Sequence, residues 1–365
     1  MTKFTLLTGA ALALALNLCA TSATAHENNP KASHSTDHAP IGVMADHRHK
    51  KGEVMLSYRY MHMNMDGSRD GTTSLSPETI ATTVANPFAG QAGQPQTLRV
   101  VPTSMTMDMH MAGAMYGVTD RLTVMAMGSY ISKSMDHTTF QGGMGTDVLG
   151  EFTTESEGFG DTTVGAIYGL DDGTNPRHQL NLNLAISLPT GSNTQTDDVL
   201  APNGTTPNLR LPYPMQIGTG TYDIKPGMTY RDTNGKVGWG GQAMFVIPLA
   251  KNKEGYRRGA RTELTGWLSY EPHNWVSFSS RVKHSSQGQI VGQDAAIVAP
   301  VQTADPANQG GNVTEVLFGV NLLAQSGALK GHRIALEYGL PLHRDLNGPQ
   351  LETDSMVTLG WQKAF

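Results

Sequence analysis

The sequence predicts an all-β fold, a transmembrane antiparallel β-barrel of about 12 strands with a short N-terminal periplasmic leader. Three observations carry this prediction. The chain holds 41 glycines among 365 residues and only 16% charged residues, a composition unlike that of long helical proteins. Beyond the first 25 residues, no apolar run approaches the roughly 20 residues that a membrane helix needs. The last ten residues alternate apolar and polar side chains and end on an aromatic residue.

Residues 1–25 are predicted to be a secretory signal peptide. Lys3 supplies the positive charge, residues 10–20 form an apolar stretch, and Ala23-Thr24-Ala25 is a small-residue cleavage site. Cleavage after Ala25 removes Cys19, the single cysteine. The mature protein is therefore expected to be exported, to contain no disulfide, and to reside in the outer membrane of a Gram-negative bacterium.

Residues 26–51 are predicted to form a polar, histidine-rich leader, because they show no periodicity and contain five of the 13 histidines. Imidazole binds copper and zinc, so weak metal capture is one interpretation, and a plain polar tail is the other. The mildly apolar stretch 39–44 directly precedes the first strand and is a candidate for a plug in the periplasmic mouth. The candidate metal ligands of the leader are His34, His38, His47 and His49.

Residues 52–365 are predicted to form the barrel, because the sequence changes there to period-2 alternation interrupted by turn residues. In residues 180–188, for example, an apolar row of Leu and Ile alternates with Asn, Ala and Ser. The twelve expected strands cover residues 52–66, 99–117, 121–136, 158–170, 178–189, 217–231, 236–249, 259–271, 274–289, 312–325, 331–343 and 353–365.

The lengths of the connections favour a membrane barrel over a soluble sandwich. Connections after the even-numbered strands are short, whereas most of the others are long, and outer-membrane barrels combine short periplasmic turns with long external loops. An even number of strands leaves both chain ends in the periplasm. The long loops are expected at residues 67–98, 137–157, 190–216 and 290–311.

The last strand carries a predicted assembly signal. Its apolar row ends on the terminal aromatic residue, a pattern similar to the one that outer-membrane barrel assembly machinery reads. This machinery and outer-membrane lipid are therefore expected partners. The row consists of Val357, Leu359, Trp361 and Phe365.

If the apolar rows face lipid, the charged side chains of the opposite rows face the lumen. An Arg or Lys on the lipid face costs about 2–4 kcal/mol at the membrane midplane, so the segregation of charges supports this assignment. These charges either pair across the lumen and brace the barrel or form a constriction that selects a solute. The candidates are Arg59, Asp161, Arg261, Glu263, Arg281, Lys283, Glu315, Arg333 and Glu337.

Methionine is concentrated early in the barrel: 13 of the 19 lie between Met55 and Met144, most of them in the first three strands. Thioether sulfur favours Cu(I), but methionine is also a flexible apolar filler, and both interpretations stay open. In the second strand Asp108 and His110 lie opposite the methionine row, so the facing of that row is left open. The methionines expected to face inward are Met55, Met61, Met63 and Met65 in the first strand and Met125, Met127 and Met135 in the third.

The chain contains no G-x-S-x-G, H-E-x-x-H, P-loop or C-x-x-C motif, so an enzyme is not expected. No cofactor is predicted to be required, and Cu(I) is the candidate ion for the methionine rows. The formal net charge of −5 gives no indication of a nucleic-acid partner.

Several segments resemble a family of uncharacterised Gram-negative outer-membrane transporter-like proteins, related to the meta-pathway phenol degradation (MetA-like) barrel proteins. The resemblance covers residues 39–365 and implies a barrel that passes a small organic, aromatic or apolar solute. Copper or other soft-metal handling by the Met and His rows is the first alternative function, and a plugged structural envelope barrel is the second. The segments include LSYRYMHMNMDG, TTESEGFGD, LPYPMQIGTGTYD, GHRIALEYGLP and GPQLETD.

Overall fold

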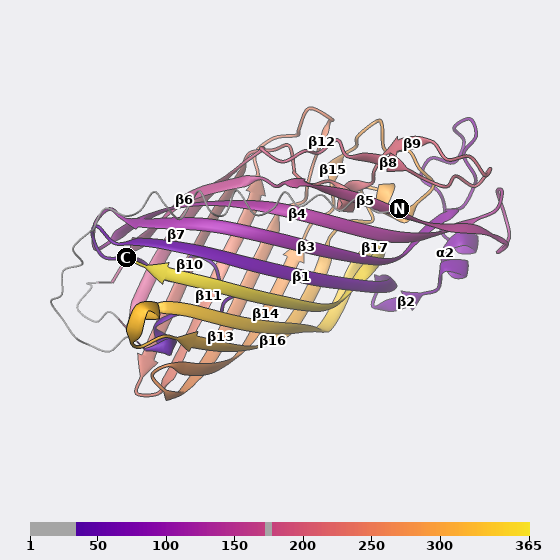
Figure 1. Cartoon of the computed structure of the whole chain (residues 1–365). Coiled ribbons are helices and arrows are strands. Elements are labelled where there is room, and N and C mark those ends of the chain that lie inside the picture. Colours follow the sequence, from indigo (N-terminus) through magenta and orange to yellow (C-terminus); the bar gives the residue numbers. More distant parts are fainter. Residues whose placement is uncertain (1–33, 172–176) are drawn as a thin grey trace, which may run out of the picture. The chain divides into compact units, whose positions relative to one another are not determined.

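The computed structural model describes residues 34–171 and 177–365, so the predicted signal peptide lies outside the described residues. Eleven strand elements form one closed antiparallel ring, because the last of them, β17, pairs with the first, β1 (Figure 1). Around the ring lie β1 (Val54–Gly71), β3 (Val100–Gly117), β4 (Leu122–Phe140), β6 (Thr162–Gly169), β7 (Gln179–Leu188), β10 (Asp223–Asn234), β11 (Val237–Pro248), β13 (Arg261–His273), β14 (Val276–Gln287), β16 (Gly311–Leu323) and β17 (His332–Ala364).

The long element β17 supplies two strands of the ring, which we call its first and second pass. Residues 333–346 pair with β16, whereas residues 346–364 pair with β1. Gly348, which has a φ of +70°, lies where the chain reverses, and Trp361 of the second pass donates a hydrogen bond to His332 of the first. Because β17 contributes two strands, the described residues form a ring of twelve strands, which confirms the predicted fold class.

One predicted loop is wrong. Residues 137–157 do not lie outside the sheet, because β4 continues to Phe140 and pairs with an additional strand, β5 (Val148–Phe159). Further along the same β4, residues 122–127 pair with β6. In β5, Thr and Ser lie on one face and Thr and Glu on the other, so this strand lacks the continuous apolar row by which the other strands are recognised.

The other loops contain short elements that pack on one another. Helix α2 (Pro77–Thr83) begins at Ser76, whose side chain accepts a hydrogen bond from the Thr79 backbone N–H. Phe88, Tyr213 and Tyr256 belong to a buried cluster that joins three of these loops. The remaining elements are η1 (Ser35–Asp37), β2 (Thr73–Leu75), β8 (Thr196–Asp198), β9 (Asn208–Arg210), η2 (Tyr213–Met215), β12 (Tyr256–Arg257), β15 (Val291–Gly292), η3 (Gln302–Ala304) and η4 (Gly327–Leu329).

The two faces of the wall have opposite chemistry. On β7, Leu182 and Leu184 are 44% and 55% exposed on the outside, whereas the neighbouring Asn181 and Asn183 are buried inside. The last strand follows the same rule, since Leu359 is exposed between the buried Thr358 and Gly360. Apolar outside and polar inside is the pattern expected of a wall surrounded by lipid. In the described part of the chain, no helix is long and apolar enough to cross a membrane.

We expect a charge on the outer face to destabilise the barrel. Leu184→Arg places a guanidinium in the middle of an outward apolar row, and the free energy of unfolding in phospholipid vesicles should fall by about 2–4 kcal/mol. Urea titration followed by tryptophan fluorescence measures this change. Thr206→Arg in an exposed loop is the matched control and should change stability by less than about 0.5 kcal/mol. Equal effects of the two substitutions would contradict the assignment of faces.

Candidate functional site

Residues 34–50 lie inside the ring, and we call this segment the plug. It lies toward the end of the barrel that carries the short connections at residues 118–121, 235–236 and 274–275, which we call the turn end. Side chains from four strands hold its backbone carbonyls. These bonds run from Arg231 to Asp37, from Arg333 to Ala39 at 2.6 Å, from Arg59 to Ile41 at 3.1 Å and from Gln242 to Met44 at 2.7 Å.

Apolar packing fixes the centre of the plug. Ala39 and Val43 pack with Trp267 of β13 in a buried cluster. Ile41 is 1% exposed and lies over Gly360, where an added Cβ would come within 2.5 Å of the isoleucine side chain. Only a residue without a side chain at position 360 permits this approach. The apolar stretch that the sequence shows at 39–44 therefore packs inside the barrel.

Both ends of the plug are anchored by charge. Near its start, His34 lies 2.6 Å from Glu271 of β13. Near its end, the Arg48 guanidinium pairs with Asp171 and donates to Asn181 at 2.9 Å. These contacts attach the two ends of the plug to different strands of the ring. In the structure, residues 34–364 belong to one compact unit.

The predicted lumenal charges make specific contacts inside the ring. Arg281 donates two hydrogen bonds to Glu337, at 2.8 and 2.7 Å, and both side chains are at most 2% exposed. Lys283 lies 2.5 Å from Glu315, and the partly exposed Arg261 lies 2.6 Å from Glu263. Together these pairs give β13, β14, β16 and the first pass of β17 a charged inner surface, which we call the charged wall.

The remaining three predicted lumenal charges hold backbone groups. Arg59 and Arg333 bind carbonyls of the plug, as described above. Asp161 accepts hydrogen bonds from the backbone N–H groups of Gly191 and Thr219, at 2.9 and 2.8 Å. It thereby holds the start and the end of the loop that connects β7 with β10.

The methionines of β1, β3 and β4 line a different sector of the lumen, which we call the methionine wall. The row of β3, whose facing the sequence left open, points inward: Met105, Met111 and Met115 are buried. Asp108 and His110 face outward, where Tyr60 donates to Asp108 and Tyr58 bonds to His110. The opposing pairs across these strands and the neighbouring β17 are Met55–Met115, Met61–Met109, Met63–Met107, Met65–Met105, Met105–Met135, Met115–Met125 and Met63–Met356.

The methionine wall extends from one end of the lumen to the other. At the end with the long loops, Met105 and Met135 pack against Met215 of η2. This turn is held by Lys133, whose ammonium donates to the carbonyls of Pro214 and Gln216 at 2.7 and 2.8 Å. At the turn end, a cavity lies between the wall and the plug, and it is lined by Met44, Asp46, Met55, Arg59, Met115, Met125 and Met127 among others.

A second cavity lies among the long loops and is largely apolar. His137 and Phe152 stack on one of its sides with ring centroids 4.6 Å apart. Leu211, which lines this cavity, also packs in the cluster of Met105 and Met135. The methionine wall therefore lies between two cavities, one at each end of the lumen.

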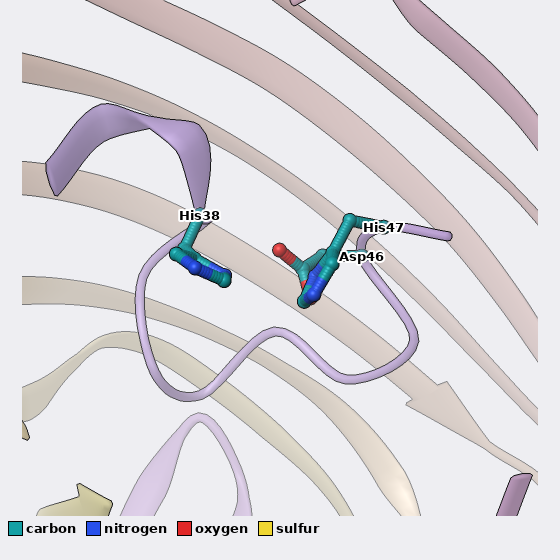
Figure 2. Close-up of side chains that lie close together, drawn as sticks. All are labelled: His38, Asp46 and His47. Atoms are coloured by element: carbon teal, nitrogen blue, oxygen red, sulfur yellow. The ribbon is translucent and has the colours of Figure 1, made fainter. Parts of the chain in front are cut away.

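Three of the four predicted leader histidines gather inside the plug. His38 and His47 approach Asp46, and one potential ligand atom from each of these three side chains lies within 4.8 Å of the other two (Figure 2). The His47 ring contacts both the His38 ring and the His49 ring, at 4.6 and 4.9 Å between centroids. His34 does not join them, because it pairs with Glu271.

The electrostatics of this group favour neutral imidazoles and an ionised carboxylate. Burial, together with Arg333, lowers the pKa of His38 well below its usual value, and burial also lowers the pKa of His47. Burial alone would raise the pKa of Asp46, but the contact with His47 holds it well below its usual value. Neutral imidazoles keep a free nitrogen lone pair, so this group has the chemistry of a metal-binding site.

Sequence reasoning missed Asp46 and Trp267. Asp46 stands directly before His47 in the sequence, so a local search for carboxylates beside the leader histidines would have found it. Trp267 lies on a strand far from the plug in sequence. Its contact with Val43 follows only from the closed ring, and no local signal indicates it.

Comparison with known proteins identifies the family of the chain. The family model described as "Putative MetA-pathway of phenol degradation" matches residues 89–292, which is more than half of the chain. The chain belongs to this family. Membership in the phenol-degradation pathway family confirms the resemblance that the sequence segments indicated.

Solved structures of outer-membrane barrels are similar in fold to this member of the phenol-degradation pathway family. The COG4313 outer membrane channel from Pseudomonas putida F1 matches with a TM-score of 0.54 and 14% identity, over 89% of this chain and 100% of that one. A Pseudomonas aeruginosa FadL homologue matches with a TM-score of 0.43 and 9% identity, over 86% and 90%. The P. putida toluene transporter TodX matches with a TM-score of 0.42 and 11% identity, over 87% and 91%. Among curated proteins, none matches the chain.

We expect the buried pair of the charged wall to contribute strongly to stability. Glu337→Gln keeps the side-chain volume but leaves the Arg281 guanidinium buried without its carboxylate, which should lower the free energy of unfolding by about 3–5 kcal/mol. Urea unfolding in detergent micelles measures this loss. Glu263→Gln at the more exposed pair is the matched control and should cost about 0.2–1 kcal/mol. Similar costs at both positions would show that the Arg281–Glu337 pair is not desolvated.

Proposed function

We propose that the protein is an outer-membrane channel for small organic solutes, aromatic or weakly polar, and that the methionine wall is their path. The observation that carries this proposal is the inward row of opposing methionines between the two cavities. Family membership and the fold of a channel support it. The family description refers to phenol degradation, and phenol belongs to this class of solute.

Methionine suits such a path for a physical reason. Its side chain is flexible and polarizable, so it adapts to solutes of different shape, and its sulfur makes favourable contacts with aromatic rings of about 0.3–1.5 kcal/mol each. Contacts of this size let a solute bind and leave again, which conduction requires. Polar nutrients would gain little from such a wall, because thioethers are only weak hydrogen-bond acceptors.

Passage requires the plug to move. Side chains of four strands hold the backbone carbonyls of the plug inside the lumen. We infer that the plug closes the barrel at its turn end. We propose that the plug is the gate and that the long-loop cavity is the entry site. Short turns face the periplasm in outer-membrane barrels, so the gate lies on the periplasmic side.

Uptake by cells tests the path. A porin-deficient Gram-negative strain expressing the protein should take up radiolabelled phenol faster than the strain with an empty vector. The triple variant Met61→Asn, Met107→Asn, Met109→Asn should lower this gain about tenfold, because three lost contacts of about 0.5 kcal/mol each sum to about 1.5 kcal/mol, and about 1.4 kcal/mol corresponds to a factor of ten.

The matched control replaces the same three methionines with leucine, which keeps the wall apolar, and its uptake should stay within about threefold of the wild type. Uptake no faster than with the empty vector would disprove the channel and favour a structural envelope barrel. Equal uptake by the asparagine variant and the wild type would exclude the methionine wall as the path.

Planar-bilayer conductance tests the gate. Deletion of residues 34–45 should raise single-channel conductance several-fold, because the lumen loses the segment that crosses it. A variant in which the same residues are replaced by Gly and Ser, with the length kept, should conduct similarly, since it loses the packing of Ile41 and Val43. Unchanged conductance in both variants would show that the plug does not limit passage.

A further inference from the structure

The plug forms a loop whose two ends meet at one group of side chains. His38 stands at the start of this loop, and Asp46 and His47 stand at its end (Figure 2). Asp46 closes the loop further, because its second carboxylate oxygen accepts a hydrogen bond from the Ala39 backbone N–H at 2.9 Å. We call His38, Asp46 and His47 the neck of the plug.

The neck contains nitrogen atoms that are buried without a partner. His38 Nδ1, His47 Nε2 and the nearby His49 Nε2 have no hydrogen-bond partner in the described part of the chain, although His47 and His49 are only 5% and 4% exposed. Buried polar atoms are nearly always paired in folded proteins. Three such imidazole nitrogens within one short segment therefore point to a ligand that accepts their lone pairs.

The second nitrogen of two of these rings is already oriented by a carboxylate. His47 Nδ1 lies 2.7 Å from Asp46, and His49 Nδ1 lies 3.3 Å from Glu53. Histidines that bind metals usually donate their other ring nitrogen to a carboxylate in this manner, which fixes the tautomer and leaves the free nitrogen toward the ion. The plug thus has both the ligands and the groups that orient them.

We propose that the neck of the plug binds one divalent transition-metal ion of the zinc type through the unpartnered imidazole nitrogens of His38 and His47, with His49 beside them as the candidate third ligand. Asp46 is the carboxylate that orients His47. Imidazole nitrogen is a ligand that zinc takes in proteins, at about 2.0–2.1 Å from the ion, so these rings must converge on one point.

The surroundings select against hard cations. Arg59, Arg231 and Arg333 are buried and bind plug carbonyls around the neck. Their positive charges repel any divalent cation, and Asp46 supplies a compensating negative charge. The ligands decide which cation fits: calcium takes six to eight oxygen ligands, whereas the neck offers mainly imidazole nitrogens.

Metal binding at the neck would fix the loop that crosses the lumen. Carbonyls of this loop, at Ala39, Ile41 and Met44, are the groups that Arg333, Arg59 and Gln242 hold. A metal ion bound at the neck would restrict the conformations of the loop and so stabilise its position inside the barrel. The metal site itself does not depend on the channel function proposed above.

Isothermal titration of the folded mature protein in detergent with ZnCl₂ tests the proposal. One Zn²⁺ should bind per chain, and His38→Gln or His47→Gln should weaken binding at least about 100-fold, because each removes a ligand. Asp46→Asn should weaken binding about 10–100-fold, the range found when a group that orients a metal ligand is lost. His343→Gln, an exposed histidine outside the plug, is the matched control and should bind as the wild type does.

A second readout keeps the test independent of variant folding. Co²⁺ added to the wild-type protein should give the visible absorption bands of a four-coordinate site, and Zn²⁺ should abolish them in proportion to occupancy. Thermal unfolding without metal identifies any variant that has lost its fold. Absence of saturable Zn²⁺ binding by the wild type, or equal binding by the folded His47→Gln variant, would overturn the proposal, whatever the outcome of the uptake assay.

Discussion

Closure of the sheet by pairing between β17 and β1 is the constraint on which the rest of the structure depends. A closed ring has no free strand edge, so every strand satisfies its backbone groups with its two neighbours, and the outer face can be fully apolar. The polar rows are then confined to the inside, where each buried group needs a partner. The plug supplies several of these partners, because its backbone carbonyls accept hydrogen bonds from the buried cations Arg59, Arg231 and Arg333.

The sequence predicted the barrel well because alternation records which face of a strand meets lipid. The positions of β1, β3, β7 and β11 differ from expectation by only a few residues at most ends. Alternation alone could not settle two features, namely the facing of the β3 methionines and the existence of β5. The facing of the β3 methionines required the outer position of Asp108, where Tyr60 and His62 bond to it, and β5 was missed because both of its faces are polar.

The candidate site was harder to predict than the wall. Histidine content marked the leader, but its partners come from β1, β10 and β17 and are separated from it by up to 295 residues, as in the bond between Gly42 and Glu337. Such contacts follow from the curvature and stagger of the closed ring, which the sequence pattern does not specify. Only the local part of the site, in which Asp46 lies beside His47, was within the reach of sequence reasoning.

The lumen is asymmetric, and the plug connects its two sectors. Its Gly42 N–H binds Glu337 of the charged wall, whereas Met44 and Asp46 face the cavity at the end of the methionine wall. The charged wall is rigid at its centre, because the Arg281–Glu337 pair is buried and joined by two hydrogen bonds. The methionine wall is adaptable, because unbranched thioether side chains change rotamer at little cost. The plug thus lies between a rigid, ion-paired sector and an adaptable, apolar one, and it contacts the first through Gly42 and the second through Met44.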